Sequence, residues 1–448
     1  MSSRYEIYLT DDKGKHLLLL NRADGGFAFF SYSRVISGYG TFQIGIPYRQ
    51  FKEQVYPVFA PDRRIEVWRS PSDDHPLRLE GIYLLRRENI YTREEDGIEI
   101  IEFYARSPID LLSRRWVIQA AGTTYTAKEA ALDDMMKEIV REQMLWGNAV
   151  DKDGIQDNSR AYPVSEFSVQ ADLTLGPVLA RRFADRNVLD FLKELKDTSF
   201  QLNEDNPATN RRIYFDIVPN YLKGMEVTIP GVPTDAVILD DIYVDWIAYE
   251  MLGYMAMDEL GGGTMDVTVT SEENAMGLQF QTFADLRGID RTSQLVFSVE
   301  NSNLKGPQYV RNHFDEKNSA IIKGSGRGES RSIVVVNDDV RIDESRWNRC
   351  ETIHEANYEV DDTELQSVGA AQLKEGQPVE EIFATFLNTG GSQNVPRSLY
   401  GIDWDLGDLV NVWYAGKSFE CEIVVVYVAI DDGGVETITG RNTIGESV

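Results

Sequence analysis

The sequence predicts a mainly β protein with α+β inserts: two β-barrel domains, a small α/β domain and a helical insert. Three observations support this fold class. Short segments with alternating apolar and polar residues fill the first quarter of the chain and return near its end, as is typical of half-buried strands. Turn sequences rich in glycine and aspartate separate these segments. Amphipathic helical patterns occur only in the interior of the chain.

The first β-barrel domain is predicted over residues 1–113. Its strand-like segments follow one another at intervals of roughly 8 to 15 residues, as in closed or nearly closed small barrels. Pro47 ends one of them, because proline cannot donate a hydrogen bond to a neighbouring strand. The predicted strands are 5–9, 16–20, 27–35, 41–46, 64–68, 79–87 and 99–105.

Residues 114–294 are predicted to form α/β and β insert domains. Thr126 and Glu129 fit a capping box, which would begin a helix. A second helix is expected to begin near Asp185. The apolar face of the first helix would consist of Leu132, Met135, Met136, Ile139, Val140 and Leu145. The strands expected in this region are 199–202, 212–218, 265–270 and 278–283.

The second β-barrel domain is predicted in two pieces, residues 295–345 and 397–448, separated by a small helical insert at 346–396. The insert contains a helix near 362–375, which ends at Gly376. Strands are expected at 296–299, 319–323, 332–336, 421–430 and 435–439.

The stretch from Tyr400 to Val412 organises the second barrel. Ile402, Trp404 and Leu406 alternate with polar residues. We therefore predict a turn that leads into a half-buried strand, with these three side chains facing the core.

Composition excludes several classes of protein. The 73 acidic and 45 basic residues give a net charge of −28, so a general basic surface for nucleic acid is excluded. The two cysteines, Cys350 and Cys421, form neither a disulfide framework nor a zinc site. No apolar run approaches the length of a membrane span, and the N-terminus lacks the apolar core of a signal peptide.

No motif demands an enzyme, a cofactor or a metal. The glycine-rich stretch 324–328 precedes a strand-like segment rather than a helix, so we interpret it as a hairpin turn and not a phosphate loop. Residues 151–158 resemble a calcium loop but lack its glycine and final glutamate. His354 and Glu355 are followed by Tyr358 where a zinc helix has its second histidine.

Asp403, Asp405 and Asp408 are the one carboxylate cluster of interest. Paired carboxylates hydrolyse glycosides, so the cluster leaves an enzyme open. The simpler interpretation is that alternate strand positions face water while Trp404 and Leu406 face the core, and we favour it.

Four stretches resemble the tail-tip or baseplate hub proteins of siphophages, a family related in fold to the central hub of contractile phage baseplates. These are 38–47, 287–292, 320–331 and 401–410. The last is the strongest, because the final barrel of this family typically opens with an Asp-x-x-Leu-Gly-Asp segment, here Asp403 to Asp408.

The resemblance implies a virion protein of the tail tip, assembled in the host cytoplasm. It implies a homotrimer in which two hub-type barrels per chain form a ring with pseudo-sixfold symmetry. The implied partners are the tail tube or distal tail protein ring, the tape measure protein, and a central fibre or other tip proteins. Genomic DNA would pass through the ring without specific binding. Since the chain ends at Val448, soon after the barrel strands, we expect no fibre or hydrolase extension.

Two other classes stay open. A carbohydrate-active β protein would use the carboxylate cluster in a cleft. A receptor-binding adhesin would expose Trp116 or Trp146 in a shallow groove, whereas a hub would bury them.

Overall fold

The chain forms two compact units in the computed structural model. Unit 1 consists of residues 1–305, 385–413 and 420–448, and unit 2 of residues 306–384 and 414–419. The structure describes residues 4–11, 14–20, 27–48, 59–72, 75–94, 96–118, 125–145, 160–162, 166–183, 185–205, 210–220, 226–228, 268–270, 277–325, 331–356, 362–391 and 396–442.

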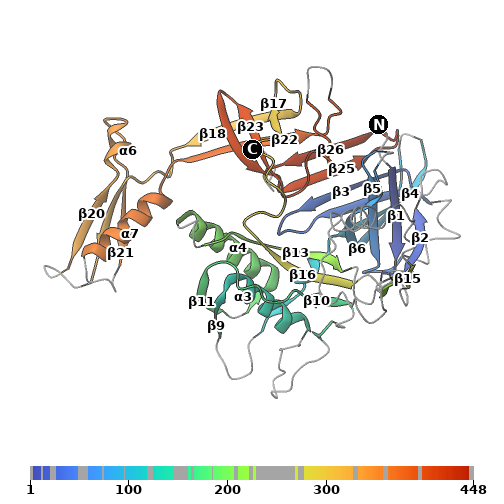
Figure 1. Ribbon diagram of the computed structural model, residues 1–448, viewed down its shortest axis with the longest axis horizontal. Helices are drawn as coiled ribbons and strands as arrows, with labels where there is room; N and C mark the ends of the chain where they lie inside the picture. Colours follow the sequence, from blue (N-terminus) through green and yellow to red (C-terminus); the bar gives the residue numbers. More distant parts are fainter. Residues whose placement is uncertain are drawn as a thin grey trace, which may run out of the picture. The chain divides into compact units, whose positions relative to one another are not determined.

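The N-terminal strands of unit 1 form one antiparallel sheet with the order β3-β4-β7-β6-β5-β1-β2 (Figure 1). On β4, Phe42 and Ile44 are buried, whereas Thr41 and Gln43 are more exposed, as the alternating sequence predicts. The strands are β1 (Arg4–Thr10), β2 (His16–Leu20), β3 (Phe29–Val35), β4 (Thr41–Pro47), β5 (Arg64–Ser70), β6 (Arg78–Thr92) and β7 (Glu99–Arg106).

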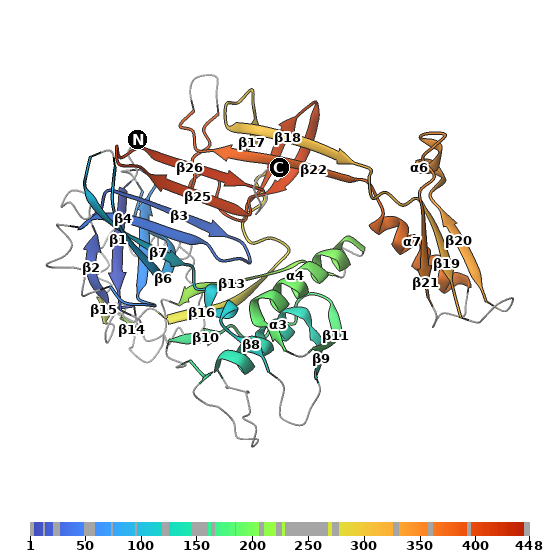
Figure 2. The same ribbon diagram turned by 180° about the vertical axis from the view of Figure 1, so that it is seen from behind.

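Two C-terminal strands, β25 (Val425–Ile430) and β26 (Glu436–Arg441), continue this sheet. Strand β25 pairs antiparallel with β3 along its whole length, and β26 pairs with the other side of β25. Figure 2 shows β3 and β25 side by side although they come from opposite ends of the chain. The two β-rich parts, which we predicted as separate barrels, therefore share one sheet.

The large sheet continues beyond β26 with β22 (Val379–Leu387) and then β18 (Leu304–Asn312). Strand β23 (Leu409–Tyr414) lies between β17 (Val296–Ser298) and β24 (Lys417–Glu422) in a three-stranded sheet. The division between the two units falls within β18, β22, β23 and β24.

The insert of unit 1 is a small α/β structure in which two helices pack on a sheet. Helices α3 (Leu132–Val140) and α4 (Val188–Asp205) contact the sheet β10-β16-β13 and share one apolar core with it. The predicted methionines Met135 and Met136 lie fully buried in that core. The other elements are α2 (Asp110–Ser113), β8 (Trp116–Val117), β9 (Thr126–Ala131), the π-helical turn Arg141–Leu145, β10 (Phe167–Val169), β11 (Val178–Phe183), β12 (Arg186–Asn187), β13 (Ile213–Asn220), β14 (Glu226–Thr228), β15 (Thr268–Thr270) and β16 (Gly277–Ala284).

Two local predictions in this insert are wrong. Thr126 does not cap a helix, because residues 126–131 pair as β9 with β11, and the helix begins only at Leu132. Residues 199–202 are not a strand but the continuation of α4. Ser199 is fully buried there, and its hydroxyl accepts a hydrogen bond from the backbone N–H of Ile213 at 2.9 Å. This contact with β13 overrides the local preference for a strand.

Unit 2 is built on a three-stranded sheet with the order β20-β19-β21. Helix α7 (Asp362–Glu375), which the sequence predicted, packs Leu365 and Leu373 on Ala320 and Ile322 of this sheet. The predicted boundaries differ here, because residues 319–323 and 333–337 belong to the sheet under α7 and not to the large sheet. The elements are β19 (Ser319–Lys323), β20 (Ile333–Asn337), α6 (Asp339–Asp343) and β21 (Glu351–Glu355).

The described structure is mostly β with small helical parts, so the predicted fold class is confirmed. None of the helices in the described ranges is long and apolar enough to cross a membrane.

Candidate functional site

The segment from Tyr400 to Asp408 is the structural centre of the C-terminal part. It is a series of turns and not the predicted strand, which begins only at Leu409. Trp404 is fully buried, as predicted, and its indole N–H donates to the carbonyl oxygen of Ser398 at 3.0 Å. Gly440 on β26 leaves room for the indole, since a Cβ there would lie 2.9 Å from a ring carbon of Trp404. The turn thus inserts an aromatic anchor into the core.

Gly407 lets the backbone of this turn approach the backbone of Gly288 closely. Its φ is +88°, a region that favours glycine, and its carbonyl accepts a hydrogen bond from the N–H of Gly288 at 3.0 Å. A Cβ at Gly407 would lie 2.8 Å from both the Cβ of Arg287 and the backbone N of Gly288. The turn therefore needs glycine for conformation and for space.

Gly407→Ala should destabilise unit 1 more than Gly97→Ala. Gly97 also has a positive φ, +70°, but a Cβ there would meet nothing within 4 Å. Both variants carry the conformational cost of about 1–2 kcal/mol, and Gly407→Ala adds the overpacking cost of about 1–3 kcal/mol. Urea denaturation of the two variants measures this difference. If both variants lose the same free energy of unfolding, the contact between Gly407 and Gly288 is not close enough to exclude a Cβ.

Asp405 links the turn to the N-terminal strands. One carboxylate oxygen lies 2.8 Å from a guanidinium nitrogen of Arg34 on β3, and the other lies 2.9 Å from one of Arg78 on β6. Arg78 also pairs at 2.7 Å with Glu80, whose side chain is completely buried. The Tyr400 hydroxyl donates to Glu80 and accepts from Arg34. These five residues bring β3, β6 and the turn together.

Arg69 on β5 extends the cluster towards β26. Its guanidinium donates to the hydroxyl of Tyr5 at 2.8 Å and to the backbone carbonyl of Tyr400 at 3.2 Å, and it lies 3.4 Å from Glu436. Arg69 is 1% exposed, so these partners replace its hydration. We call Arg34, Arg69, Arg78, Glu80, Asp405 and Glu436, together with the hydroxyls of Tyr5 and Tyr400, the junction cluster.

The charges of the junction cluster balance, with three arginines against three carboxylates. Burial raises the pKa of Asp405, but the Arg78 and Arg34 guanidiniums outweigh it and lower the pKa to about 2. Burial likewise opposes ionisation of Glu80, yet Arg78 and Arg34 hold its pKa below the usual range. Both carboxyls are therefore anions at neutral pH. They act as fixed ion-pair partners and not as proton donors.

Asp405→Asn should remove part of the acid sensitivity of unit 1. Because the pKa is lower in the folded chain than the value of about 3.9 in the unfolded chain, Asp405 stabilises the fold above pH 4. This contribution, about 2 kcal/mol from the pKa difference, is lost as the pH falls from about 4 to about 2. The difference in unfolding free energy between wild type and variant should shrink by about 1 kcal/mol from pH 6 to pH 3. A difference that stays constant over this range would contradict the ion pairs.

The carboxylates of Asp403 and Asp408 bind other side chains than that of Asp405, although Asp408 also accepts from the backbone N–H of Asp405 at 2.9 Å. Asp403 binds the Arg397 side chain and the N–H of Leu399, while Asp408 accepts from the N–H of Ile289 at 2.8 Å and from Arg291 at 2.6 Å. Asp408 is only 2% exposed, and burial raises its pKa although Ile289 and Arg291 act against this. Our interpretation that the three carboxylates face water is wrong, because each one holds a different part of the turn.

One protein-family model matches nearly the whole chain. The family model of Siphovirus ReqiPepy6 Gp37-like proteins matches residues 7–445. The chain belongs to this family. The predicted resemblance to a siphophage protein family is thereby confirmed. No curated protein matches the chain.

Several solved structures are similar to the chain at low identity. The 43 kDa tail protein of prophage MuSo2 from Shewanella oneidensis is 12% identical, with a TM-score of 0.47 and coverage of 98% of this chain and 97% of that one. Prophage tail protein gp18 from Listeria monocytogenes EGD-e is 8% identical, with a TM-score of 0.44 and coverage of 98% and 95%. The tail protein from Neisseria meningitidis MC58 is 9% identical, with a TM-score of 0.43 and the same coverage. Similarities of this size carry no inference about function.

Two of the other motifs lie wholly or partly outside the described residues. Strands β19 and β20 pair antiparallel, as expected if 324–328 is a hairpin turn, although residues 326–328 lie outside the described ranges. The calcium-like stretch 151–158 also lies outside them. Within the described part of the chain, no group of three histidine, cysteine or carboxylate side chains is arranged to hold a metal.

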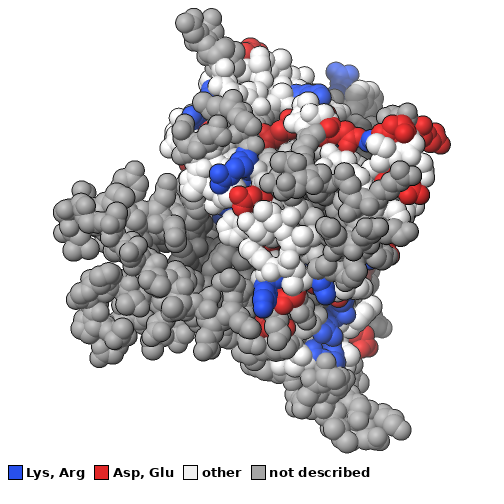
Figure 3. Space-filling model, turned by 90° about the vertical axis from the view of Figure 1, so that its right-hand side faces the viewer, with Lys and Arg blue, Asp and Glu red and all other residues white. Residues whose placement is uncertain are grey.

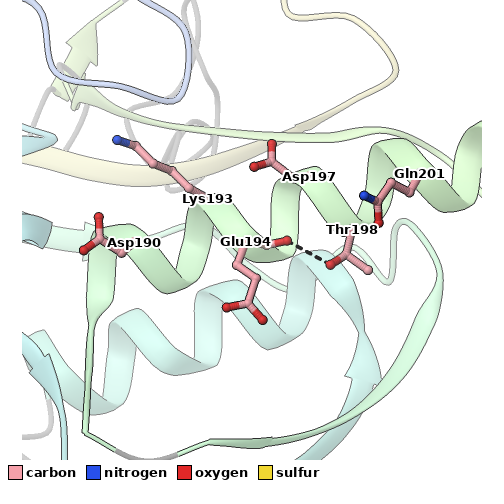
Figure 4. A pocket seen from close by; sticks show the side chains of 6 residues that line it. All are labelled: Asp190, Lys193, Glu194, Asp197, Thr198 and Gln201. Atoms are coloured by element: carbon pink, nitrogen blue, oxygen red, sulfur yellow. Dashed lines mark hydrogen bonds between the residues drawn. The ribbon is translucent and has the colours of Figure 1, made fainter. Parts of the chain in front are cut away.

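Two surface features bear on the alternatives. Trp116 is 54% exposed, which differs from our expectation of a buried side chain, whereas Trp146 lies outside the described ranges. A concavity on unit 1 runs along the exposed side of α4 (Figure 4). Because all the residues that line it come from this one helix, it lacks the convergent groups of a binding site. They are Asp190, Lys193, Glu194, Asp197, Thr198 and Gln201.

Most of the junction cluster was not predicted from the sequence. Arg34 and Glu80 lie within predicted strands, and Arg69 and Arg78 lie just beyond the ends of predicted strands. The sequence did contain a signal. Arg69 and Glu80 stand at two-residue spacing from the apolar residues of their strands, so their side chains are expected to face the core. An inward charge needs a partner, but the sequence does not say which one.

Proposed function

We propose that the protein is the structural hub of a siphophage tail tip or baseplate, in which three copies form a ring with pseudo-sixfold symmetry. The single observation that carries this proposal is the pairing of β3 with β25. It places the N-terminal and C-terminal β parts of one chain side by side in a common sheet. Three such chains present six β parts to a sixfold tube, which is the geometry of a symmetry adaptor.

The edge of the sheet supports association between copies. Strand β2 is the last strand of the large sheet, and Leu17 and Leu19 on it are 40% and 43% exposed. An open edge with apolar side chains favours pairing with another chain unless something covers it. In the proposed ring the neighbouring copy covers this edge.

The charge of the chain suits a path for DNA. With a net charge of −28, the protein offers phosphates little to bind, so DNA would pass without being retained. On the face seen in Figure 3, acidic side chains form a run across the upper part and basic side chains occur in separate groups. A basic surface on the inside of the ring would contradict this part of the proposal.

The proposed partners follow from the hub role. They are the tail tube or distal tail protein ring, the tape measure protein and the central fibre or other tip proteins, in a tail assembled in the host cytoplasm. We propose no catalysis. The carboxylates considered for glycoside hydrolysis are held by arginines and backbone N–H groups, and Asp408, whose pKa is raised by burial, is only 2% exposed, whereas a glycosidase presents its carboxyls to the substrate.

Light scattering of the purified protein, followed by class averages from electron microscopy, tests the proposal. We expect a mass of three times 50.8 kDa and a ring with an axial hole. A monomer that cleaves cell-wall glycan, and loses this activity in Asp405→Ala, would replace the hub by the carbohydrate-active enzyme.

A further inference from the structure

The three most exposed large apolar side chains of the described chain all belong to one end of unit 2. Phe314 is 94% exposed, Trp347 86% and Val340 80%. We call these three residues the apolar tip. Isolated exposed apolar side chains are common, but a tryptophan, a phenylalanine and a valine that are nearly completely exposed on segments joined to one another indicate an interaction site.

A network of hydrogen bonds holds the three segments of the apolar tip together. Arg341, next to Val340, lies 3.5 Å from Glu316 and accepts at its carbonyl a hydrogen bond of 2.8 Å from the side chain of Asn348, which follows Trp347. Glu316 also bonds His313, which precedes Phe314, at 2.7 Å. The three apolar side chains are therefore displayed on a fixed polar base.

Arg341 anchors this base to the core of unit 2. Its guanidinium donates to the carbonyls of Leu373 and Gly376 at the end of α7, at 2.9 and 3.1 Å, and pairs with Asp338 at 2.7 Å. A rigid display of tryptophan and phenylalanine lowers the entropic cost of binding and is typical of binding hot spots.

The charges around the apolar tip indicate which kind of partner can bind there. The same segments carry four exposed acidic residues and two exposed arginines, Arg346 and Arg349. The acidic residues are Asp315, Asp339, Asp343 and Glu344. A second copy that bound through the same tip would bring like acidic charges together, and anionic lipid and nucleic acid are disfavoured by the same acids. A protein with an apolar pocket and a rim of lysine and arginine is complementary in both respects.

We propose that the apolar tip docks into such a basic-rimmed apolar pocket on a different protein of the tail. The inference rests on the proposed place of the chain in a phage tail but not on the trimeric ring. It assigns to unit 2 the role of a connector whose specificity lies in Trp347 and Phe314 and in the acids around them.

The experiment places the photo-reactive residue p-benzoylphenylalanine at Trp347 in the full chain, produced together with the other structural proteins of the tail. After irradiation, mass spectrometry identifies the protein and the peptide joined to this position. The matched control carries the same residue at Val435, which is 61% exposed in unit 1 beside Asp431 and Asp432. Both positions face solvent, so neither change threatens folding.

We expect one tail protein other than this chain to be joined at position 347, through a peptide with lysine or arginine beside apolar residues. Asp339→Lys with Asp343→Lys should lower the yield at least about tenfold, which corresponds to about 1.4 kcal/mol, whereas Glu99→Lys in unit 1 should leave it unchanged. Crosslinks mainly to a second copy, equal yields at Val435, no crosslink in assembled tails, or no effect of the two lysines would each overturn the proposal.

Discussion

Glu80→Gln is expected to destabilise unit 1 by about 3–5 kcal/mol, the usual loss when one partner of a buried ion pair is removed. The amide has nearly the same shape as the carboxylate, so the change mainly removes a charge. Arg34, Arg69 and Arg78 would then share only Asp405 and Glu436, which leaves a net positive charge in a buried cluster. The concentration of urea at half-unfolding should fall accordingly.

Glu99→Gln is the matched control for this experiment. Glu99 lies on β7 of the same sheet but is exposed, and such changes usually alter stability by no more than about 0.5 kcal/mol. If Glu80→Gln unfolds at the same urea concentration as Glu99→Gln, the junction cluster does not hold the β parts together. A combined replacement of Glu80 and Arg78 by apolar residues should recover part of the loss, because no unpaired charge would then be left at that pair.

Elements whose pattern is repeated locally could be predicted from the sequence. Helix α7 was predicted near residues 362–375, where it lies, because its apolar residues recur at helical spacing and Gly376 ends them. The burial of Trp404 and Leu406 was predicted from alternation alone. The same alternation led to the wrong prediction of a strand. A series of turns can also place every second side chain inward for a few residues, so the pattern does not distinguish the two.

Elements that depend on distant partners could not be predicted. Arg34 and Asp405 are 371 positions apart, and Tyr400 and Glu80 are 320 apart, so no local period announces these contacts. The sequence of β9 fits the start of a helix. It forms a strand because it pairs with β11, which lies some distance away in the sequence and therefore gives no local signal. The pairing of β3 with β25 is of the same kind, and it converts two predicted barrels into one sheet.

Trp404→Ala is expected to destabilise unit 1 by about 3–5 kcal/mol. The indole is fully buried, lies 5.2 Å from the ring of Tyr400 between centroids, and faces Gly440, which cannot fill the space that is left. The variant therefore loses packing beside the strands that join the N-terminal sheet. Thermal unfolding followed by calorimetry measures the loss.

Trp413→Ala provides the control, because Trp413 is 46% exposed on β23 and its removal leaves no closed cavity. Trp404→Phe should be intermediate, since it keeps an aromatic ring but loses the hydrogen bond to the Ser398 carbonyl. If the loss of packing at Trp404 also disturbs the pairing of β25, the trimer should dissociate more readily in light scattering, and the temperature of unfolding should fall as well. Equal stabilities of the two alanine variants would mean that the turn from Tyr400 to Asp408 is held by its ion pairs alone.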